Sequence, residues 1–300
     1  MSGLKEHNSF KGISLIAAAG IIFGAFPIFT SLFVLYGGDV DTFNLYGFIL
    51  TLIFLAAWLA IKRIPFAIPK KSVGYILLAG FFNVATRILL TYSYSYLDVG
   101  VATTLHFMYP LFAAALGALF FREKMKLYKW IAFIVASGSV SLFTTGSQGG
   151  SQLLGILLAL ASAVCFALYM LTTEKAGLTD LNPEVFVFYV TAVSVVGCLA
   201  VSIGGGQLTL ALPVKAIVVL ILCAIVNNVI GFAAQQQGVK YLGAAMAALF
   251  SLFEPVFSCI FGALFLDQTI GWKSILGIVL ILLSLVFIVV MDHRKEKQSA

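Results

Sequence analysis

The sequence predicts an all-α membrane protein in which ten transmembrane helices form two inverted five-helix repeats. Three observations lead to this prediction: the long apolar segments, the distribution of positive charge, and an internal repeat. The 300 residues are 61% hydrophobic and 10% charged, with a mean hydropathy of +1.08. A soluble domain is about 45–50% apolar and about 25% charged, so this composition excludes an ordinary soluble protein.

Ten apolar segments follow one another along the chain, each close to the ~20 residues that a helix needs to cross a bilayer. A single segment in lipid must satisfy its backbone hydrogen bonds internally, and the alternating pattern of barrel strands is absent, so we expect helices. The predicted spans are 13–36, 42–61, 72–95, 100–121, 129–145, 153–173, 184–203, 213–236, 241–265 and 272–291.

The positive charges fall on alternate loops. With the N-terminus in the cytoplasm, fifteen Lys and Arg residues face the cytoplasm, Lys215 and Lys273 face the other side, and Arg87 lies within a span. This positive-inside distribution reports membrane topology rather than affinity for nucleic acid. We therefore expect a multi-pass protein of the cytoplasmic (inner) membrane, with both termini cytoplasmic and no nucleic-acid partner.

The second half of the chain repeats the first. At a shift of 145 residues, the segment that begins at Tyr96 aligns with the segment that begins at Tyr241. The Tyr-Leu pair matches, Pro110 falls on Pro255, and each segment continues to the letters "GALF". Self-similarity over such a length predicts two copies of one structural unit.

The repeat also covers the beginning of each half. At a shift of 143 residues, "GISLIAAAGIIFGAF" from Gly12 aligns with "GILLALASAVCFALY" from Gly155. We expect a first five-helix repeat at 1–148 and a second at 149–300. Because five is odd, the second copy enters the membrane from the opposite side, which is the inverted-repeat arrangement of many secondary transporters.

Two segments carry a resemblance to a known family: "FFREKMKLYKW" after the fourth span and "LFEPVFSCIFGALFL" in the ninth. With the ten spans and the two repeats, they make nearly the whole chain similar to the drug/metabolite transporter superfamily, EamA type. Glu123 fits the family pattern. The loop after the ninth span departs from it, because Asp267-Gln268 stands where the family often carries Gly-Glu.

The resemblance implies a secondary transporter that moves small organic metabolites, such as amino acids or amines, out across the cytoplasmic membrane by alternating access. Spans 1, 3, 4, 6, 8 and 9 would surround the path, with 5 and 10 outside. Partners would be the small-molecule substrate and the lipid bilayer; coupling to protons and a homodimer stay open. The alternative is a non-transporting membrane protein that acts in lipid interaction or assembly, with its polar side chains in seams that lack a connected cavity.

Motifs for other activities are absent from the sequence. There is no GxxxxGK[ST] loop for ATP, no HExxH, and no Gly-x-Ser-x-Gly. The four cysteines are far apart in apolar segments, without a CxxC pair. We therefore expect no enzyme, no cofactor and no metal site.

Three ionisable side chains lie within predicted spans: Arg87, His106 and Glu254. At 1.5 Å per residue, all three lie about 20 Å from the inner face. A charge at a helix centre costs about 2.5–3.5 kcal/mol, so such groups face a cavity or one another. An ion pair between Arg87 and Glu254, a purely structural role, and substrate contact all stay open. An unpaired Glu254 could exchange protons, whereas a paired one would be a fixed charge.

Uncharged side chains join this set. Asn83 and Asn228 occupy equivalent repeat positions, although an interhelical hydrogen bond of about 0.6 kcal/mol would explain either of them. Tyr109 occupies the repeat position of Glu254, and Tyr169 lies in the sixth span. The predicted substrate path is lined by Asn83, Arg87, His106, Tyr109, Tyr169, Asn228 and Glu254.

Two prolines lie inside spans. Pro110 and Pro255 each remove one helical hydrogen bond, so they predict kinks in the fourth and ninth spans.

Overall fold

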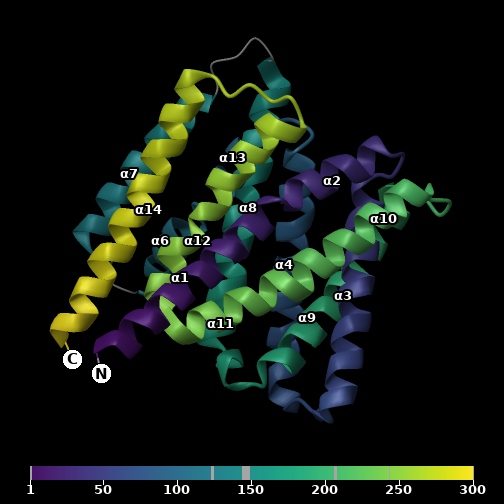
Figure 1. The fold of residues 1–300 in the computed structure, drawn as a ribbon, viewed down its shortest axis with the longest axis horizontal. Helices are drawn as coiled ribbons and strands as arrows, with labels where there is room; N and C mark the ends of the chain where they lie inside the picture. The colour runs from purple at the N-terminus through teal and green to yellow at the C-terminus, as the bar shows by residue number, and fades with distance from the viewer. Residues whose placement is uncertain (1, 123–124, 144–148, 206–207, 243, 300) are drawn as a thin grey trace.

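The computed structural model describes residues 2–122, 125–143, 149–205, 208–242 and 244–299. These residues form helices and contain no strand (Figure 1). The α-helices are α1 (Ser2–Gly24), α2 (Phe26–Leu35), α3 (Val40–Lys62), α4 (Val73–Ser93), α5 (Val99–His106), α6 (Tyr109–Phe121), α7 (Leu127–Ser139), α8 (Gly149–Lys175), α9 (Pro183–Gly205), α10 (Val214–Cys223), α11 (Phe232–Leu242), α12 (Ala244–Ser251), α13 (Phe253–Phe265) and α14 (Trp272–Ser299). Short 3₁₀ turns η1 (Lys70–Ser72), η2 (Val140–Phe143) and η3 (Leu178–Asp180) and the π-helical segment η4 (Ala224–Gly231) join them.

Seven helical segments of the described chain are long and apolar enough to cross a membrane. They are Lys11–Leu35, Val40–Lys62, Lys70–Ser93, Val99–Phe121, Ser151–Lys175, Pro183–Gly205 and Trp272–Asp292. Shorter apolar helices at Leu127–Phe143, Val214–Asn227 and Leu249–Phe265 coincide with the fifth, eighth and ninth predicted spans. The prediction of an all-helical membrane protein is confirmed, while the count of ten spans stays a prediction because three of the segments are short.

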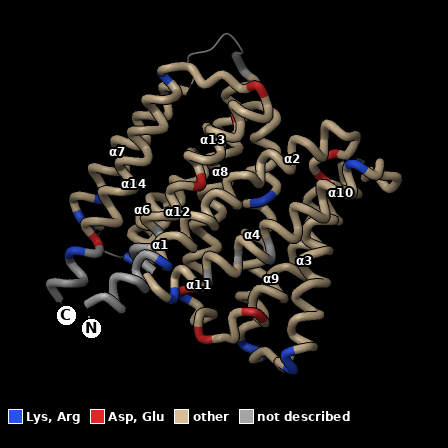
Figure 2. Tube along the Cα trace, in the orientation of Figure 1, with Lys and Arg blue, Asp and Glu red and all other residues tan. Residues whose placement is uncertain are grey.

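Both ends of the chain lie at the same end of the bundle (Figure 1). Figure 2 shows that most of the Lys and Arg positions gather there, with few elsewhere. The alternation of charge along the sequence therefore becomes a separation of charge in space.

The two halves contact each other reciprocally. A Cβ added to Gly12 of α1 would lie 2.7 Å from Cγ of Leu242 at the end of α11. A Cβ added to Gly155 of α8 would lie 2.7 Å from Cγ of Leu97, just after α4. Gly12 and Gly155 are equivalent in the repeat, and so are Leu97 and Leu242. At these two positions, each half makes to the other half the same contact that it receives from it.

Helix α1 approaches α13 closely along a small-residue face. A Cβ added to Gly24 would lie 2.8 Å from Cβ of Phe257 and 2.9 Å from the carbonyl oxygen of Glu254. One turn earlier, a Cβ added to Gly20 would lie 3.2 Å from Cβ of Phe253 in α13. The Ser258 hydroxyl donates a hydrogen bond to the Gly24 carbonyl at 3.1 Å. Such G-x-x-x-G faces let two membrane helices approach to backbone contact.

We expect Gly24→Ala to lower the free energy of unfolding by about 1–3 kcal/mol, because the added methyl group meets backbone atoms that cannot yield. Thermal unfolding of the purified protein in detergent measures this. Gly138→Ala is the matched control, because a Cβ there meets nothing within 4 Å. Equal unfolding temperatures for the two variants would contradict the close packing of α1 on α13.

The N-terminus of α3 is capped by Asp39. Its carboxylate accepts hydrogen bonds from the Thr42 amide at 2.7 Å and the Thr42 hydroxyl at 2.6 Å. It also accepts one from the Thr209 hydroxyl at 2.7 Å, which ties the segment before α10 to α3. Partial burial raises the pKa of Asp39, but the hydrogen bonds from Thr42 and Thr209 outweigh it, so the pKa is lowered from its ordinary value of 3.8.

Asp39→Ala should lower stability at pH 7 by about 1 kcal/mol, the usual effect of removing an N-cap. Because the pKa is lowered by folding, the contribution of the carboxylate is fully present above about pH 4 and is lost as the pH falls through the lowered pKa. Unfolding curves at pH 7 and pH 3 test this, and the gap between wild type and variant should narrow at pH 3. Asp39→Asn, which keeps a good cap, should lose less.

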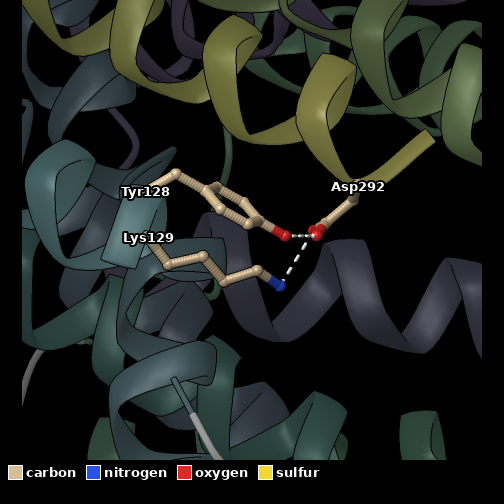
Figure 3. Close-up of polar contacts among 3 residues, drawn as sticks. All are labelled: Tyr128, Lys129 and Asp292. Carbon is tan, nitrogen blue, oxygen red and sulfur yellow. Dashed lines mark hydrogen bonds and ion pairs between the residues drawn. The ribbon is translucent and has the colours of Figure 1, made fainter. Parts of the chain in front are cut away.

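Helices α7 and α14 are joined by a polar contact (Figure 3). Lys129 Nζ lies 2.8 Å from Asp292 Oδ2, and the Tyr128 hydroxyl donates to Asp292 Oδ1. The Lys129 and Asp292 side chains are 25% and 34% exposed, and a pair that open contributes at most about 1 kcal/mol. This exposed contact links α7, in the last predicted span of the first repeat, to α14, which contains the last predicted span of the second.

Candidate functional site

The fourth and ninth predicted spans are both interrupted near the middle. Residues 107–108 separate α5 from α6, and Pro110 lies in the first turn of α6. Leu252 separates α12 from α13, and Pro255 lies in the first turn of α13. Because proline has no backbone N–H and its ring clashes with the preceding turn, each interruption begins where the sequence predicts a kink.

The two interruptions bring four side chains to the wall of a central hollow. His106 ends α5 and Tyr109 begins α6; Ser251 ends α12, and Glu254 is the second residue of α13. At the shift of 145, His106 corresponds to Ser251, and Tyr109 corresponds to Glu254. Each half therefore presents the same two positions with different chemistry.

The hollow consists of two adjoining cavities. The first, here the Arg87 cavity, has a volume of about 260 Å³, and the second, the Tyr109 cavity, about 360 Å³. The residues that line both are Phe23, His106, Phe166 and Glu254. The Arg87 cavity is also lined by Phe26, Phe48, Asn83, Thr86, Arg87, Leu90, Tyr94 and Asn227, and the Tyr109 cavity by Phe107, Tyr109, Gln235, Val239, Ala247 and Ser251.

Phe23 and Phe166 form the apolar part of the wall that the two cavities share. They occupy equivalent positions at the shift of 143. Phe166 packs edge-on against the Tyr109 ring, with the ring centroids 4.6 Å apart. Each half therefore contributes one phenylalanine, at the equivalent repeat position, to the wall that both cavities share.

A third and larger hollow, the loop cavity, has a volume of about 800 Å³. It lies among the connections around residues 94–98 and 267–274, at the end of the bundle away from the chain termini (Figure 1). Tyr94 lines both this cavity and the Arg87 cavity. Burial raises the pKa of Asp98, which lines the loop cavity.

Gln268 has a structural role at this end of the molecule. Its side-chain oxygen Oε1 accepts a hydrogen bond from the Val99 amide, the first residue of α5, at 3.0 Å. This is the turn at which the sequence departs from the pattern of the family it resembles. Here an amide oxygen supplies the acceptor that satisfies a free N–H at the start of a helix.

Arg87 lies on α4 and faces the Arg87 cavity. Its guanidinium carbon lies 3.8 Å from the centre of the Phe26 ring and 5.5 Å from that of Phe48. Its Nε is buried and has no hydrogen-bond partner among the described residues. The charge is therefore held by aromatic faces and not by an anion.

Glu254 faces both cavities from the other half of the chain. The ion pairs of the described residues are Lys129–Asp292 and Lys175–Glu174, so Arg87 and Glu254 do not pair. Their side chains line one cavity without touching. When Glu254 is ionised, the cavity has two unpaired charges of opposite sign on its walls, which suits a ligand that carries both charges.

His106 is oriented by a hydrogen bond to α8. Its Nδ1 lies 3.0 Å from the Ser162 hydroxyl, which donates its own proton to the Ala159 carbonyl at 2.6 Å. Nδ1 is consequently the donor to Ser162. Ser162 is fully buried and its proton is already engaged, so this Ser–His contact is not arranged for nucleophilic attack.

The remaining predicted site residues have different surroundings. Asn83 lines the Arg87 cavity, and its amide nitrogen donates to the Ser194 hydroxyl of α9 at 3.0 Å, which is the interhelical hydrogen bond considered as the alternative. Tyr169 stacks between Phe166 and Phe186 and is not among the residues that line the cavities. The side chain of Asn228 lies outside the described part of the structure.

Several lining residues were missed by the sequence analysis, chiefly the aromatic ones. Phe23 and Phe166 could have been found from their alignment at the shift of 143, which pairs them on spans expected to line the path. Phe26 and Phe48, which flank Arg87, carry no such signal. Among many apolar side chains, nothing in sequence marks the two that meet one cation.

These features define a class of protein. An all-helical membrane protein with polar and charged side chains around a central hollow, made from two repeated halves, is a membrane transporter by architecture. The sequence matches the model of the EamA-like transporter family over residues 10–145 and again over 153–290. The chain belongs to this family, and each match covers one half.

Relatives with curated descriptions agree. An uncharacterized transporter of Synechocystis sp. is 23% identical over 245 residues, which are 81% of this chain and 73% of the relative. The uncharacterized transporter YdfC of Bacillus subtilis is 25% identical over 228 residues, 74% of this chain and 72% of the relative. A crystal structure of another protein superimposes with a TM-score of 0.64 at 14% identity, covers 95% of this chain and 98% of that one, and supports the fold alone.

Because Tyr94 lines both the loop cavity and the Arg87 cavity, we expect its ring to limit passage between them. In a chain without its native cysteines, a cysteine at Leu90, which lines the Arg87 cavity, should react with a small methanethiosulfonate added at the loop-cavity end. Tyr94→Leu should raise this rate by at least about tenfold, because access rather than thiol chemistry limits a buried cysteine. Tyr94→Phe, which keeps the ring, should leave the rate unchanged. Equal rates in all three proteins would contradict a barrier at Tyr94.

Proposed function

We propose that the protein is a secondary transporter that exports small organic metabolites, such as amino acids or amines, by alternating access. One observation carries the proposal. The loop cavity and the Arg87 cavity share the lining residue Tyr94, and the Arg87 cavity and the Tyr109 cavity share four lining residues, so the three cavities follow one another as a series. A solute could pass through such a series if side chains between neighbouring cavities open and close in turn, as alternating access requires.

The proposed topology has ten spans in two inverted five-helix repeats, at 1–148 and 149–300, with both termini in the cytoplasm. The reciprocal glycine contacts of α1 and α8 support a two-fold relation between the halves. Five spans per half would then make the halves antiparallel. The gathering of Lys and Arg at the end with the chain termini supports a cytoplasmic location for that end (Figure 2).

The alternative is a membrane protein that transports nothing and acts in lipid interaction or assembly. It predicts polar side chains in closed seams. Arg87, His106 and Glu254 instead line adjoining cavities that also contain aromatic side chains. This arrangement favours a solute path.

Proton coupling is proposed for Glu254, because its carboxyl group lines both cavities and makes no hydrogen bond or ion pair with the described residues. A carboxyl group without a fixed partner can be protonated in one state of a transport cycle and ionised in the other. Outward movement of solute is proposed from the family resemblance.

The function is tested with purified protein in liposomes. Counterflow of a panel of labelled amino acids and amines is measured with and without a pH gradient, beside liposomes without protein. Accumulation of at least one panel member supports the proposal. Folded, oriented protein that moves none of them would overturn it.

Glu254→Gln should remove the response of flux to the pH gradient, because an amide cannot carry a proton. If the carboxylate also binds the solute, loss of that charge-assisted hydrogen bond, about 1.5–3 kcal/mol, corresponds to a reduction in flux of about tenfold or more. Glu174→Gln is the matched control, since Glu174 is exposed and pairs with Lys175 away from the cavities. Full gradient-driven flux through Glu254→Gln would exclude the proton role.

A further inference from the structure

The Arg87 cavity contains a cation that its own chain leaves unneutralised. Both ion pairs of the described residues involve other side chains, and Nε of Arg87 is buried without a hydrogen-bond partner. An arginine at membrane depth costs about 2.5–3.5 kcal/mol even where water and neighbours help. A position that keeps such a charge exposed only to a cavity favours an anion as its transient partner.

The aromatic neighbours explain how the guanidinium is held while no anion is bound. With the guanidinium carbon 3.8 Å from the centre of the Phe26 ring, one face of the planar group is covered by a π-system. Phe48 lies further away, at 5.5 Å. The cation–π contact stabilises the positive charge, but the rings provide no hydrogen-bond acceptor for the five N–H donors in the guanidinium plane. The donors of the guanidinium plane therefore still need an acceptor, and a planar group with two oxygens is the acceptor that fits this fork.

The only other buried polar atom without a partner in this cavity, within the described residues, is Oδ1 of Asn227. Its amide nitrogen is turned toward Cys223 Sγ, at 3.8 Å. A neutral amide would in any case not neutralise the charge of Arg87. The two orphaned groups therefore indicate a polar ligand that the cavity accommodates beside both.

The opposite wall limits what that anion can be. Glu254 lines the same cavity, so in the state of the cycle in which its carboxyl group is ionised, Arg87 and Glu254 together leave the cavity without net charge. A ligand with several negative charges would be repelled by Glu254, and a simple cation would be repelled by Arg87. A solute with one carboxylate, an amine or hydrogen-bond donor at the other end, and an apolar body beside Phe23 and Phe166 matches the charges and volumes of about 260 and 360 Å³.

We propose that Arg87 is the residue that selects solutes with a carboxylate, by binding that group through its guanidinium edge in the Arg87 cavity. The proposal rests on the transport function proposed above and narrows it. Amines and cationic compounds that lack a carboxylate are then poor substrates. Planar bidentate contact is the geometry that distinguishes arginine from lysine at such a site.

The test compares acids with their amides on the unmodified protein. Binding of alanine, leucine, phenylalanine and glutamine, each beside its carboxamide, is measured by calorimetry on protein in nanodiscs, and counterflow of the same compounds is measured in liposomes. At least one acid should bind and compete at least about tenfold better than its amide, the effect of one charge-assisted bidentate pair. Because this comparison needs no variant, it stands even if substitutions at position 87 fail to fold.

Substitutions assign the preference to Arg87. Arg87→Gln should abolish the difference between acid and amide, and Arg87→Lys should retain only part of it, because lysine keeps the charge but not the fork. Arg122→Gln is the charge-matched control: Arg122 caps α6 at a helix end and lines neither cavity. Unfolding temperature without solute verifies that each variant is folded.

The outcomes separate this proposal from the function on which it rests. Flux of amines or amides equal to that of the acids would overturn the carboxylate site while leaving a transporter. A carboxylate preference that survives in folded Arg87→Gln would overturn the role of Arg87. Binding of acids without any flux would support the site and overturn transport, and neither binding nor flux of any compound would overturn both.

Discussion

The unpaired charges at the centre of the molecule are the constraint on which the rest of the structure depends. Arg87 and Glu254 lie on the otherwise apolar helices α4 and α13, and neither finds an ion-pair partner among the described residues. In a medium of low dielectric they are tolerated only beside a cavity that water or a solute can enter. The cavity lies beside the interruptions between α5 and α6 and between α12 and α13. The G-x-x-x-G face of α1 packs closely against α13, the helix that contains Glu254.

The repeat gives the molecule its symmetry, and the site depends on where the symmetry is broken. Phe23 and Phe166 are the same residue type at equivalent repeat positions. Gly12 and Gly155 each pack against the equivalent leucine of the other half. Tyr109 and Glu254 are equivalent in position but differ in charge. Two similar halves would by themselves give a site with two similar walls. A solute whose two ends differ in charge needs walls that differ in chemistry, and Tyr109 and Glu254 provide that difference.

How far the fold could be predicted follows from the same physics. Helical membrane-spanning segments are apparent because each must be apolar over its whole length, and Pro110 and Pro255 mark interruptions because proline cannot donate the missing hydrogen bond. Asn83 and His106 were identified as polar groups at depth, but their partners, Ser194 and Ser162, were not. Those hydroxyls come from segments 56 or more residues away, and any serine in a span would have looked the same.

The sequence by itself determined the membrane class, the duplication and the three ionisable positions at mid-depth, because hydropathy, charge and repetition are local properties of the chain. Only the tertiary structure decided that Arg87 lies over Phe26 and not against Glu254, that Tyr169 belongs to an aromatic stack, and that Tyr94 lines two cavities. These facts depend on how helices distant in sequence rotate and cross. That geometry is set by packing summed over many small contacts, and no single segment encodes it.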